Sequence, residues 1–353
     1  MLGTACWPDV VVPAPPRQLG DTRISGIHRI AARHWGVVLA QVDPDARSIS
    51  HYGRHAYENQ CDAALHGSPR RRHDLGVPRW RRTPLVLCPG LTSTQDELGE
   101  LLGLLRHDFD VVSFDLRGHG LSSAADRYCF DGFLGDVVAV MAEVGRLGLP
   151  SAPLLAGYSY GADLIVHYAA EHPDTVGELV VIDGANPIPA PFITQADVPE
   201  FRALWENLAT AQETLRGTPR QVLLTAQEIL DLNLELDVIR SGIDLGIDVV
   251  GPGILDRYRT IDLPIRMIMS TSMAGDSGEG RAPRHNRLWR AGIDRLVREP
   301  RITTSWLDAT HALVVTHAPD IAQMIRSTPG PAGQATSRVA SRSLGDWSDA
   351  DHR

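Results

Sequence analysis

The sequence contains no lysine, so all 34 of its Lys and Arg residues are arginine. A lysine forms the Schiff base with carbonyl substrates and with pyridoxal phosphate, and it completes the P-loop that binds nucleoside triphosphates. Each of those chemistries is therefore excluded. Basic residues are also outnumbered by 43 acidic residues, which gives a net charge of −9. A general affinity for nucleic acid or for an anionic membrane is not expected at this charge.

Cysteine is equally scarce, with four scattered residues and no C-x-x-C pair: Cys6, Cys61, Cys88 and Cys129. This spacing favours buried free thiols over zinc ligation or a disulfide framework. The N-terminus has no basic start and no long apolar run, so we expect neither a signal peptide nor a transmembrane span. A cytoplasmic protein without a metal or other cofactor is the resulting expectation.

A five-residue motif, Gly157-Tyr158-Ser159-Tyr160-Gly161, follows an apolar run and precedes a helix-compatible run. Strand, G-x-S-x-G and helix in that order form a nucleophile elbow, where a sharp turn presents the serine hydroxyl above a sheet. The turn crowds both neighbours of the serine, so glycine is favoured on either side. The following helix directs free N–H groups at the site. Ser159 is therefore predicted to be a nucleophile.

Apolar runs that predict buried strands alternate with helical patterns from Thr83 onward. This alternation predicts an α/β fold, in which a mostly parallel central sheet has helices on both faces. Three further motifs follow predicted strands: PGL at 89–91, DLRGHGLSS at 115–123 and Thr310-His311.

These three motifs and GYSYG at 157–161 resemble those of the α/β-hydrolase fold family, whose members often carry an inserted helical cap. The resemblance covers roughly Thr83 to Ser327 and rests on four motifs in the family's order. It implies the α/β-hydrolase fold and a serine hydrolase's machinery, but not a substrate. One departure is Pro89, where relatives often have a histidine before the glycine, so any role of that histidine is absent.

The resemblance also implies how the chain is organised. The hydrolase core is predicted at 23–184 and 263–327, and its first antiparallel strands are expected before residue 43. Residues 185–262 are predicted to form the helical cap, because their pattern is mostly helical without a strand signal. The proline-rich segment 1–22 is expected to be loosely ordered, and 328–353 are expected to form a disordered tail.

The family binds the developing oxyanion of its reaction with two backbone N–H groups, and the resemblance places these at Leu91 and Tyr160. Gly90 is expected to let the backbone approach the substrate closely. Tyr158 is expected to contact the substrate, and the ring of Tyr160 to line the same pocket.

A serine needs a general base, because its hydroxyl is not ionised near neutral pH. His311 is predicted to be that base, because it follows the last strand, where the family brings a histidine over the serine. Its rivals are His317, near the start of a helix, and His119, within a motif that is mainly architectural in relatives.

Two aspartates remain open as the acid that orients the base. Many relatives carry it after the next-to-last strand, near Asp276. Others, including polyketide-type thioesterases, carry it one strand earlier, where Asp183 stands. Asp183 is favoured, because a strand end holds its backbone while Asp276 lies in a glycine-rich loop.

The predicted function is a serine hydrolase that cleaves a carboxylic ester, thioester or lactone of a small molecule through an acyl-enzyme on Ser159. Two alternatives use the same triad: an acyltransferase or cyclase, and a cofactor-free lyase. A third belongs to a different class, a receptor-like protein that binds a ligand with the hydrolase fold. The expected partner is a small acyl substrate, with no nucleic acid or membrane. Substrate identity and oligomeric state stay open.

Overall fold

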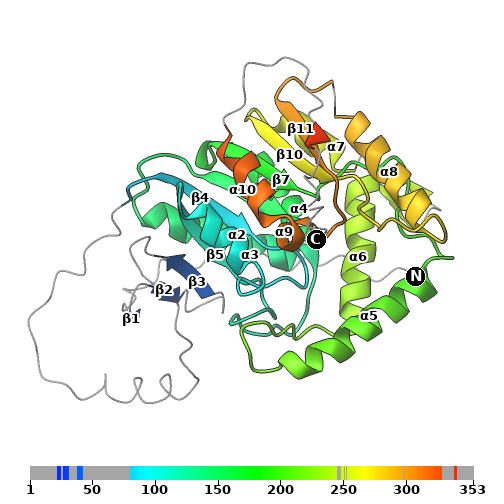
Figure 1. Cartoon of the computed structure of the whole chain (residues 1–353), viewed down its shortest axis with the longest axis horizontal. Coiled ribbons are helices and arrows are strands. Elements are labelled where there is room, and N and C mark those ends of the chain that lie inside the picture. The colour runs from blue at the N-terminus through cyan, green and yellow to red at the C-terminus, as the bar shows by residue number, and fades with distance from the viewer. Residues whose placement is uncertain are drawn as a thin grey trace, which may run out of the picture.

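The computed structural model describes residues 80–244, 248–249, 251, 253–296 and 298–327, together with short strands at 22–24, 27–31, 38–42 and 338–339. Within these residues one sheet has the strand order β1-β2-β3-β5-β4-β6-β7-β10-β11-β12 (Figure 1). The strands are β1 (Thr22–Ile24), β2 (Ile27–Ala31), β3 (Val38–Val42), β4 (Thr83–Cys88), β5 (Phe109–Phe114), β6 (Leu154–Tyr158), β7 (Glu178–Ile182), β10 (Ile265–Ser270), β11 (Ile302–Leu307) and β12 (Arg338–Val339).

The sheet is mostly parallel, as the alternating pattern predicted. Strands β1, β2 and β3 pair antiparallel with one another, and β3 pairs antiparallel with β5. From β5 to β12 every neighbouring pair is parallel. The carboxyl ends of the parallel strands therefore meet at one edge of the sheet, which is where ligands bind in such folds.

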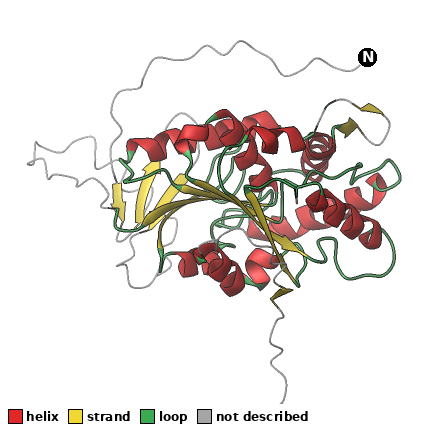
Figure 2. Cartoon of the chain, turned by 90° about the horizontal axis from the view of Figure 1, so that it is seen from above, coloured by secondary structure: helices red, strands yellow, loops and turns green. Residues whose placement is uncertain are grey.

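Helices cover both faces of this sheet, which Figure 2 shows from above. Alternate residues of β4 explain the two layers: Val86 and Cys88 belong to one hydrophobic core, while Leu85 and Leu87 belong to another. The first core includes residues of α3 (Phe130–Arg146), α4 (Tyr160–Glu171), α7 (Leu255–Thr260) and α8 (Ala282–Asp294). The second includes residues of α2 (Gly99–Leu105), α9 (Leu313–Thr316) and α10 (Ala318–Arg326).

The segment between β7 and β10 is the β7–β10 insertion. It contains α5 (Val198–Gln212), the 3-10 helix η2 (Glu213–Leu215), α6 (Ala226–Ser241), β8 (Ile243–Asp244), β9 (Asp248–Val249) and α7. Helix α6 begins with a capping box, in which Thr225 and Glu228 each accept the other's backbone N–H. The insertion extends from the sheet beside α3 and α4 (Figure 1).

The insertion also contains an antiparallel pair of short strands, β8 and β9, where the sequence pattern gave no strand signal. Strands of two residues are too short to give an alternating pattern in the sequence. Helix α7 also packs into the core of the sheet, where the buried Tyr258 hydroxyl donates to the carbonyl of Ala185 at 2.8 Å.

Near the C-terminus, β12 extends the sheet beside β11 within the segment 328–353, for which no regular structure was expected. The other residues of that segment, and residues 1–21, lie outside the described part of the chain. Among the helices that are described, none combines the length and apolar character needed to cross a bilayer.

Candidate active site

Ser159 stands at the turn between β6 and α4, with φ 53° and ψ −120°. A positive φ is strained for a residue with a side chain, and it is found where the surrounding structure holds the backbone firmly. Here the N–H of Ser159 donates to the carbonyl of Ile182 on the neighbouring strand at 2.9 Å. The sharp turn that the sequence motif predicted is therefore tied to the edge of the sheet.

The two glycines of the motif are required by close packing. A Cβ on Gly157 would lie 2.5 Å from the carbonyl oxygen of Gly161, and one on Gly161 would collide with the carbonyl of Pro89. Gly184 is equally constrained, because a Cβ there would collide with the carbonyl of Ser159. The elbow thus fits against its neighbours only without side chains at these positions.

Ser159, His311 and Asp183 form a continuous hydrogen-bonded chain. The Oγ of Ser159 lies 2.8 Å from Nε2 of His311, and Nδ1 of His311 lies 2.8 Å from Oδ2 of Asp183. Because a carboxylate can only accept, Nδ1 carries the proton and Nε2 is free to accept from the serine hydroxyl. This is the arrangement in which a histidine can take the proton of an attacking serine.

Asp183 is completely buried and has φ 45°. Oδ1 accepts from the N–H of Ser270 at 2.8 Å and from Nε1 of Trp289 at 3.0 Å. Oδ2 accepts from Oγ of Ser270 at 2.7 Å as well as from His311. A buried carboxylate is costly unless it is hydrogen-bonded, and here four donors satisfy it.

The other sequence candidates lie elsewhere. Asp276 is exposed in the loop between β10 and α8, and the aspartate against His311 is Asp183. His317 immediately precedes α10, with Nδ1 2.8 Å from Oγ1 of Thr316. The structure thus brings together one of the two aspartates and one of the three histidines that the sequence offered.

The predicted oxyanion donors flank the serine. Leu91 follows Gly90, and a Cβ on Gly90 would lie 3.0 Å from Cβ of Ser159. Tyr160 is the first residue of α4. Within the described part of the chain neither Leu91 N–H nor Tyr160 N–H has a protein acceptor. Two free donors beside a nucleophile are what an oxyanion requires.

His119 forms a hydrogen bond with this loop. It is fully buried, and burial lowers its pKa to about 4, so the ring is neutral near pH 7. Its Nδ1–H donates to the carbonyl of Arg117 at 2.8 Å, and its Nε2 accepts from the N–H of Thr92 at 3.0 Å. Thr92 has φ 69°, so His119 holds a strained residue directly after Leu91.

The two tyrosine side chains of the motif are buried, and their expected contacts with the substrate stay predictions. Tyr158 is 7% exposed, and its hydroxyl donates to the carbonyl of His311 at 2.7 Å. Its ring packs against the His311 imidazole with centroids 5.3 Å apart. Tyr160 is 1% exposed and packs between Phe130 and Phe133. The motif pattern alone does not say which way a flanking ring points.

Sequence reasoning missed three contributors to the site. Ser270 and Trp289 bind Asp183, and Arg240 of α6 forms a bidentate pair with the buried Asp163 of α4, at 2.9 and 2.5 Å. Ser270 ends β10 next to Asp183's strand, so the parallel register could have suggested it. Trp289 and Arg240 lie on helices whose placement no local pattern specifies.

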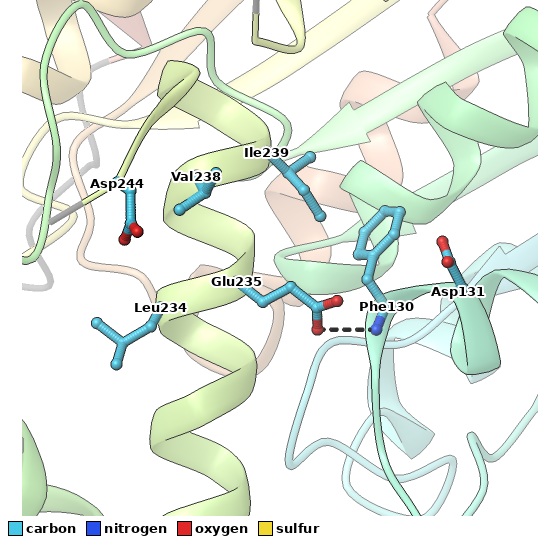
Figure 3. Close-up of a pocket in the computed structure, with 7 residues that line it drawn as sticks. All are labelled: Phe130, Asp131, Leu234, Glu235, Val238, Ile239 and Asp244. Atoms are coloured by element: carbon cyan, nitrogen blue, oxygen red, sulfur yellow. Dashed lines mark hydrogen bonds between the residues drawn. The ribbon is translucent and has the colours of Figure 1, made fainter. Parts of the chain in front are cut away.

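A separate hollow of about 480 Å³ lies between the start of α3 and α6 (Figure 3). Its lining residues are Phe130, Asp131, Leu234, Glu235, Val238, Ile239 and Asp244. A carboxylate oxygen of Glu235 accepts the N–H of Phe130 at 2.9 Å across it. None of Ser159, Asp183 and His311 lines this hollow.

Comparisons with known proteins identify the family. The family described as the alpha/beta hydrolase fold matches residues 83–293, more than half of the chain. N-formylmaleamate deformylase of Pseudomonas putida is 38% identical over 101 residues, which are 28% of this chain and 36% of that protein. The bifunctional esterase/perhydrolase DCH of Acinetobacter calcoaceticus is 33% identical over 98 residues, 27% and 34% of the two chains.

Among solved structures, the enol-lactonase from Burkholderia xenovorans LB400 is similar with a TM-score of 0.49 and 19% identity, over 69% of this chain and 90% of that one. The matches to the deformylase and to DCH span only about a third of each of those proteins. The long family match, with the elbow and the parallel sheet, establishes that the chain belongs to the α/β-hydrolase fold family.

Proposed function

We propose that this protein is a serine hydrolase that cleaves a carboxylic ester, thioester or lactone of a small molecule. The observation that carries the proposal is the chain of two 2.8 Å contacts from Ser159 through His311 to Asp183. A serine with a base in contact and an orienting carboxylate behind it is the arrangement that activates a hydroxyl for acyl transfer.

In the proposed first half-reaction, the Oγ of Ser159 attacks the substrate carbonyl while Nε2 of His311 takes its proton. The carbonyl oxygen becomes negatively charged and accepts from the N–H groups of Leu91 and Tyr160. Such preorganised donors stabilise the transition state more than the ground state. The proton on His311 then passes to the leaving group, and the acyl group remains on Ser159.

In the second half-reaction a water molecule takes the place of the leaving group. His311 removes a proton from this water, whose oxygen bonds to the acyl carbon while the same two N–H groups bind the oxyanion. The bond between the acyl carbon and Oγ of Ser159 then breaks, His311 returns the proton to Oγ, and the carboxylic acid product is released. Asp183 holds the imidazole in one orientation throughout. Residues 185–262, the proposed cap, shape the substrate pocket, since this segment leads away from Asp183 and carries helices beside the elbow.

The names of the partial relatives support acyl chemistry. One is a deformylase and another an esterase/perhydrolase, and both names denote reactions at an acyl group. The matches are short, so they support the reaction class and leave the substrate to experiment.

The proposal is tested by Ser159→Ala together with Ser151→Ala, a control at an exposed serine. We expect wild type and Ser151→Ala to be labelled by a fluorophosphonate probe and to hydrolyse p-nitrophenyl esters of some chain length. Ser159→Ala should remain folded, lose labelling and lower kcat by on the order of 10⁴ to 10⁶. Circular dichroism and the thermal midpoint check the fold.

Two outcomes would count against the proposal. If the wild-type protein neither reacts with the probe nor turns over any ester, the receptor-like alternative gains support. If Ser159→Ala keeps near-normal turnover, the nucleophile is a different residue.

A further inference from the structure

One of the four hydrogen bonds to the buried carboxylate of Asp183 comes from a residue that lies neither on the adjacent strand nor in the proposed triad. Ser270, which supplies two of its donors, ends the adjacent parallel strand, and His311 is the proposed base. The remaining donor is Nε1 of Trp289, which reaches Oδ1 at 3.0 Å from α8. Trp289 is the largest side chain of the core and is 2% exposed.

Trp289 is itself held on several sides. Its backbone carbonyl accepts from Nδ2 of Asn186 at 2.7 Å, three residues after Asp183. The ring of Phe192 meets the indole edge-to-face, with centroids 6.1 Å apart. The guanidinium carbon of Arg240, from α6, lies 5.6 Å from the centre of the indole. Two contacts of the indole, those of Phe192 and Arg240, thus come from the β7–β10 insertion.

An aspartate carboxylate rotates over a broad range about its last bond. In Asp183, Oδ2 must face His311 while Oδ1 faces away from it. The two N–H donors on Oδ1, from Ser270 and Trp289, fix that rotation from two directions. Without the indole N–H, Oδ1 would keep only the N–H of Ser270 as a donor. One acceptor site of a fully buried carboxylate would then lose its partner, and the rotation of the carboxylate would be restrained less tightly.

We propose that Trp289 is a positioning residue of the triad. Its indole N–H orients the carboxylate of Asp183 toward His311. Because Phe192 and Arg240 of the β7–β10 insertion pack on the same indole, the position of the insertion affects the orientation of that carboxylate. This inference rests on the proposed hydrolase function for its kinetic consequence, but the hydrogen bond itself can be tested without turnover.

The kinetic test compares Trp289→Phe with Trp80→Phe. Phenylalanine keeps an aromatic ring and removes the indole N–H. Trp80 provides a matched control outside the proposed cap, because its indole N–H donates to the carbonyl of Leu147 at 3.0 Å and not to Asp183. We expect Trp289→Phe to lower kcat by about 10- to 100-fold with KM unchanged, as loss of a hydrogen bond to a charged group does. Trp80→Phe should leave kcat within twofold.

The structural test uses indole ¹⁵N–¹H NMR spectra of wild type and Asp183→Asn. The Trp289 indole resonance should shift clearly in Asp183→Asn, and the Trp80 resonance should stay in place. The low-field resonance of the His311 Nδ1 proton should move or broaden in Trp289→Phe and remain unchanged in Trp80→Phe. The indole measurement remains possible even if Trp289→Phe folds poorly, because Asp183→Asn keeps the Trp289 indole.

An unmoved Trp289 indole resonance in Asp183→Asn overturns the proposal, as does a Trp289→Phe variant with wild-type kcat. A variant that loses thermal stability and activity while its His311 proton resonance is unchanged would reduce Trp289 to a packing residue, and the proposal would fail. If wild type shows no hydrolase activity but the indole responds to Asp183, the proposed function fails and the positioning contact stands.

Discussion

At the scale of single residues, several residues with strained backbone angles lie at the candidate active site. Ser159, Asp183 and Thr92 all have positive φ although none is glycine, with values of 53°, 45° and 69°. Each such residue costs on the order of 1–3 kcal/mol and persists only where neighbours hold it. The holding contacts are visible: Ile182 accepts from Ser159 N–H, Ile268 from Asp183 N–H, and His119 from Thr92 N–H. The strained residues are therefore the proposed nucleophile, its proposed acid and a residue of the proposed oxyanion loop.

The choice between the two aspartates gives a prediction at this scale. Asp183→Asn should lower kcat by on the order of 10³ to 10⁴, because asparagine can hold His311 in the wrong tautomer. Asp276→Asn should leave kcat near wild type, since that residue is exposed in the loop after β10. Steady-state kinetics on the same ester decide between them, and the reverse ranking would contradict the assignment.

How far the sequence could predict the site also becomes clear from individual residues. Ser159 and its two glycines belong to one local motif, because the elbow's sterics act within five residues. His311 and Asp183 could be placed because both follow strands whose carboxyl ends share an edge. Trp289 and the ring direction of Tyr158 could not, because they depend on how a helix and a loop pack against that edge.

At the scale of elements, α4 and the β7–β10 insertion are joined by a buried ion pair. The carboxylate of Asp163 is fully buried in the first turn of α4, and the side chain of Arg240 on α6 is 13% exposed. The same carboxylate accepts the N–H of Ala185 at 3.1 Å. A second buried carboxylate, Asp237, accepts the N–H groups of Phe192 and Ile193. Helix α6 therefore anchors both the elbow helix and the start of the insertion.

Arg240→Met is predicted to lower the free energy of unfolding by about 3–5 kcal/mol, because it leaves Asp163 buried without its cation. Adding Asp163→Asn should recover part of this loss, since the uncompensated charge is then removed. Arg257→Met is the matched control at a half-exposed pair with Glu171 and should cost no more than about 1 kcal/mol. Urea unfolding measures all three, and equal effects of the two arginine variants would contradict the anchoring role.

At the scale of the whole molecule, the sheet was the most predictable feature. Residues 84–88 of β4 are all apolar and all buried, because a strand buried on both faces reads as a continuous apolar run. The insertion was less predictable: β8 and β9 left no signal, and α7 packs into the core while lying in the segment expected to form the cap. The local sequence specifies long strands and helices that have a regular burial pattern. How these elements pack against one another depends on residues that are distant in the sequence.

Stability against acid is a second property of the whole molecule. Burial lowers the pKa of His119 and of His285 to about 4, each from an ordinary value of 6.5. Burial raises the pKa of Asp237 to about 6, which acts in the opposite sense. When the pKa of a histidine is lower in the folded protein than in the unfolded one, its contribution to the free energy of unfolding is fully present above pH 6.5. That contribution is lost as the pH falls toward 4, because the unfolded chain then gains a proton that the folded protein does not bind. An aspartate whose folded pKa is raised favours the folded state at the acid end instead.

His119→Gln isolates one of these contributions. Glutamine can accept the N–H of Thr92 but takes up no proton, so the variant should be less stable than wild type at pH 7 and should approach it as the pH falls. In the unfolded wild-type chain His119 binds a proton below pH 6.5, whereas in the folded protein it binds one only below about pH 4. The difference in unfolding free energy should therefore narrow by about 3 kcal/mol between pH 7 and pH 4. Effects of His285 and Asp237 are common to both proteins and cancel in the difference.

Urea unfolding at pH 8, 7, 5.5 and 4 measures the difference in unfolding free energy between the two proteins. The range from pH 8 to pH 7 is the internal control, where this difference should stay constant. A difference that stays constant down to pH 4 would mean that His119 is not held neutral in the folded protein, and its support of the oxyanion loop through an accepting Nε2 would have to be abandoned.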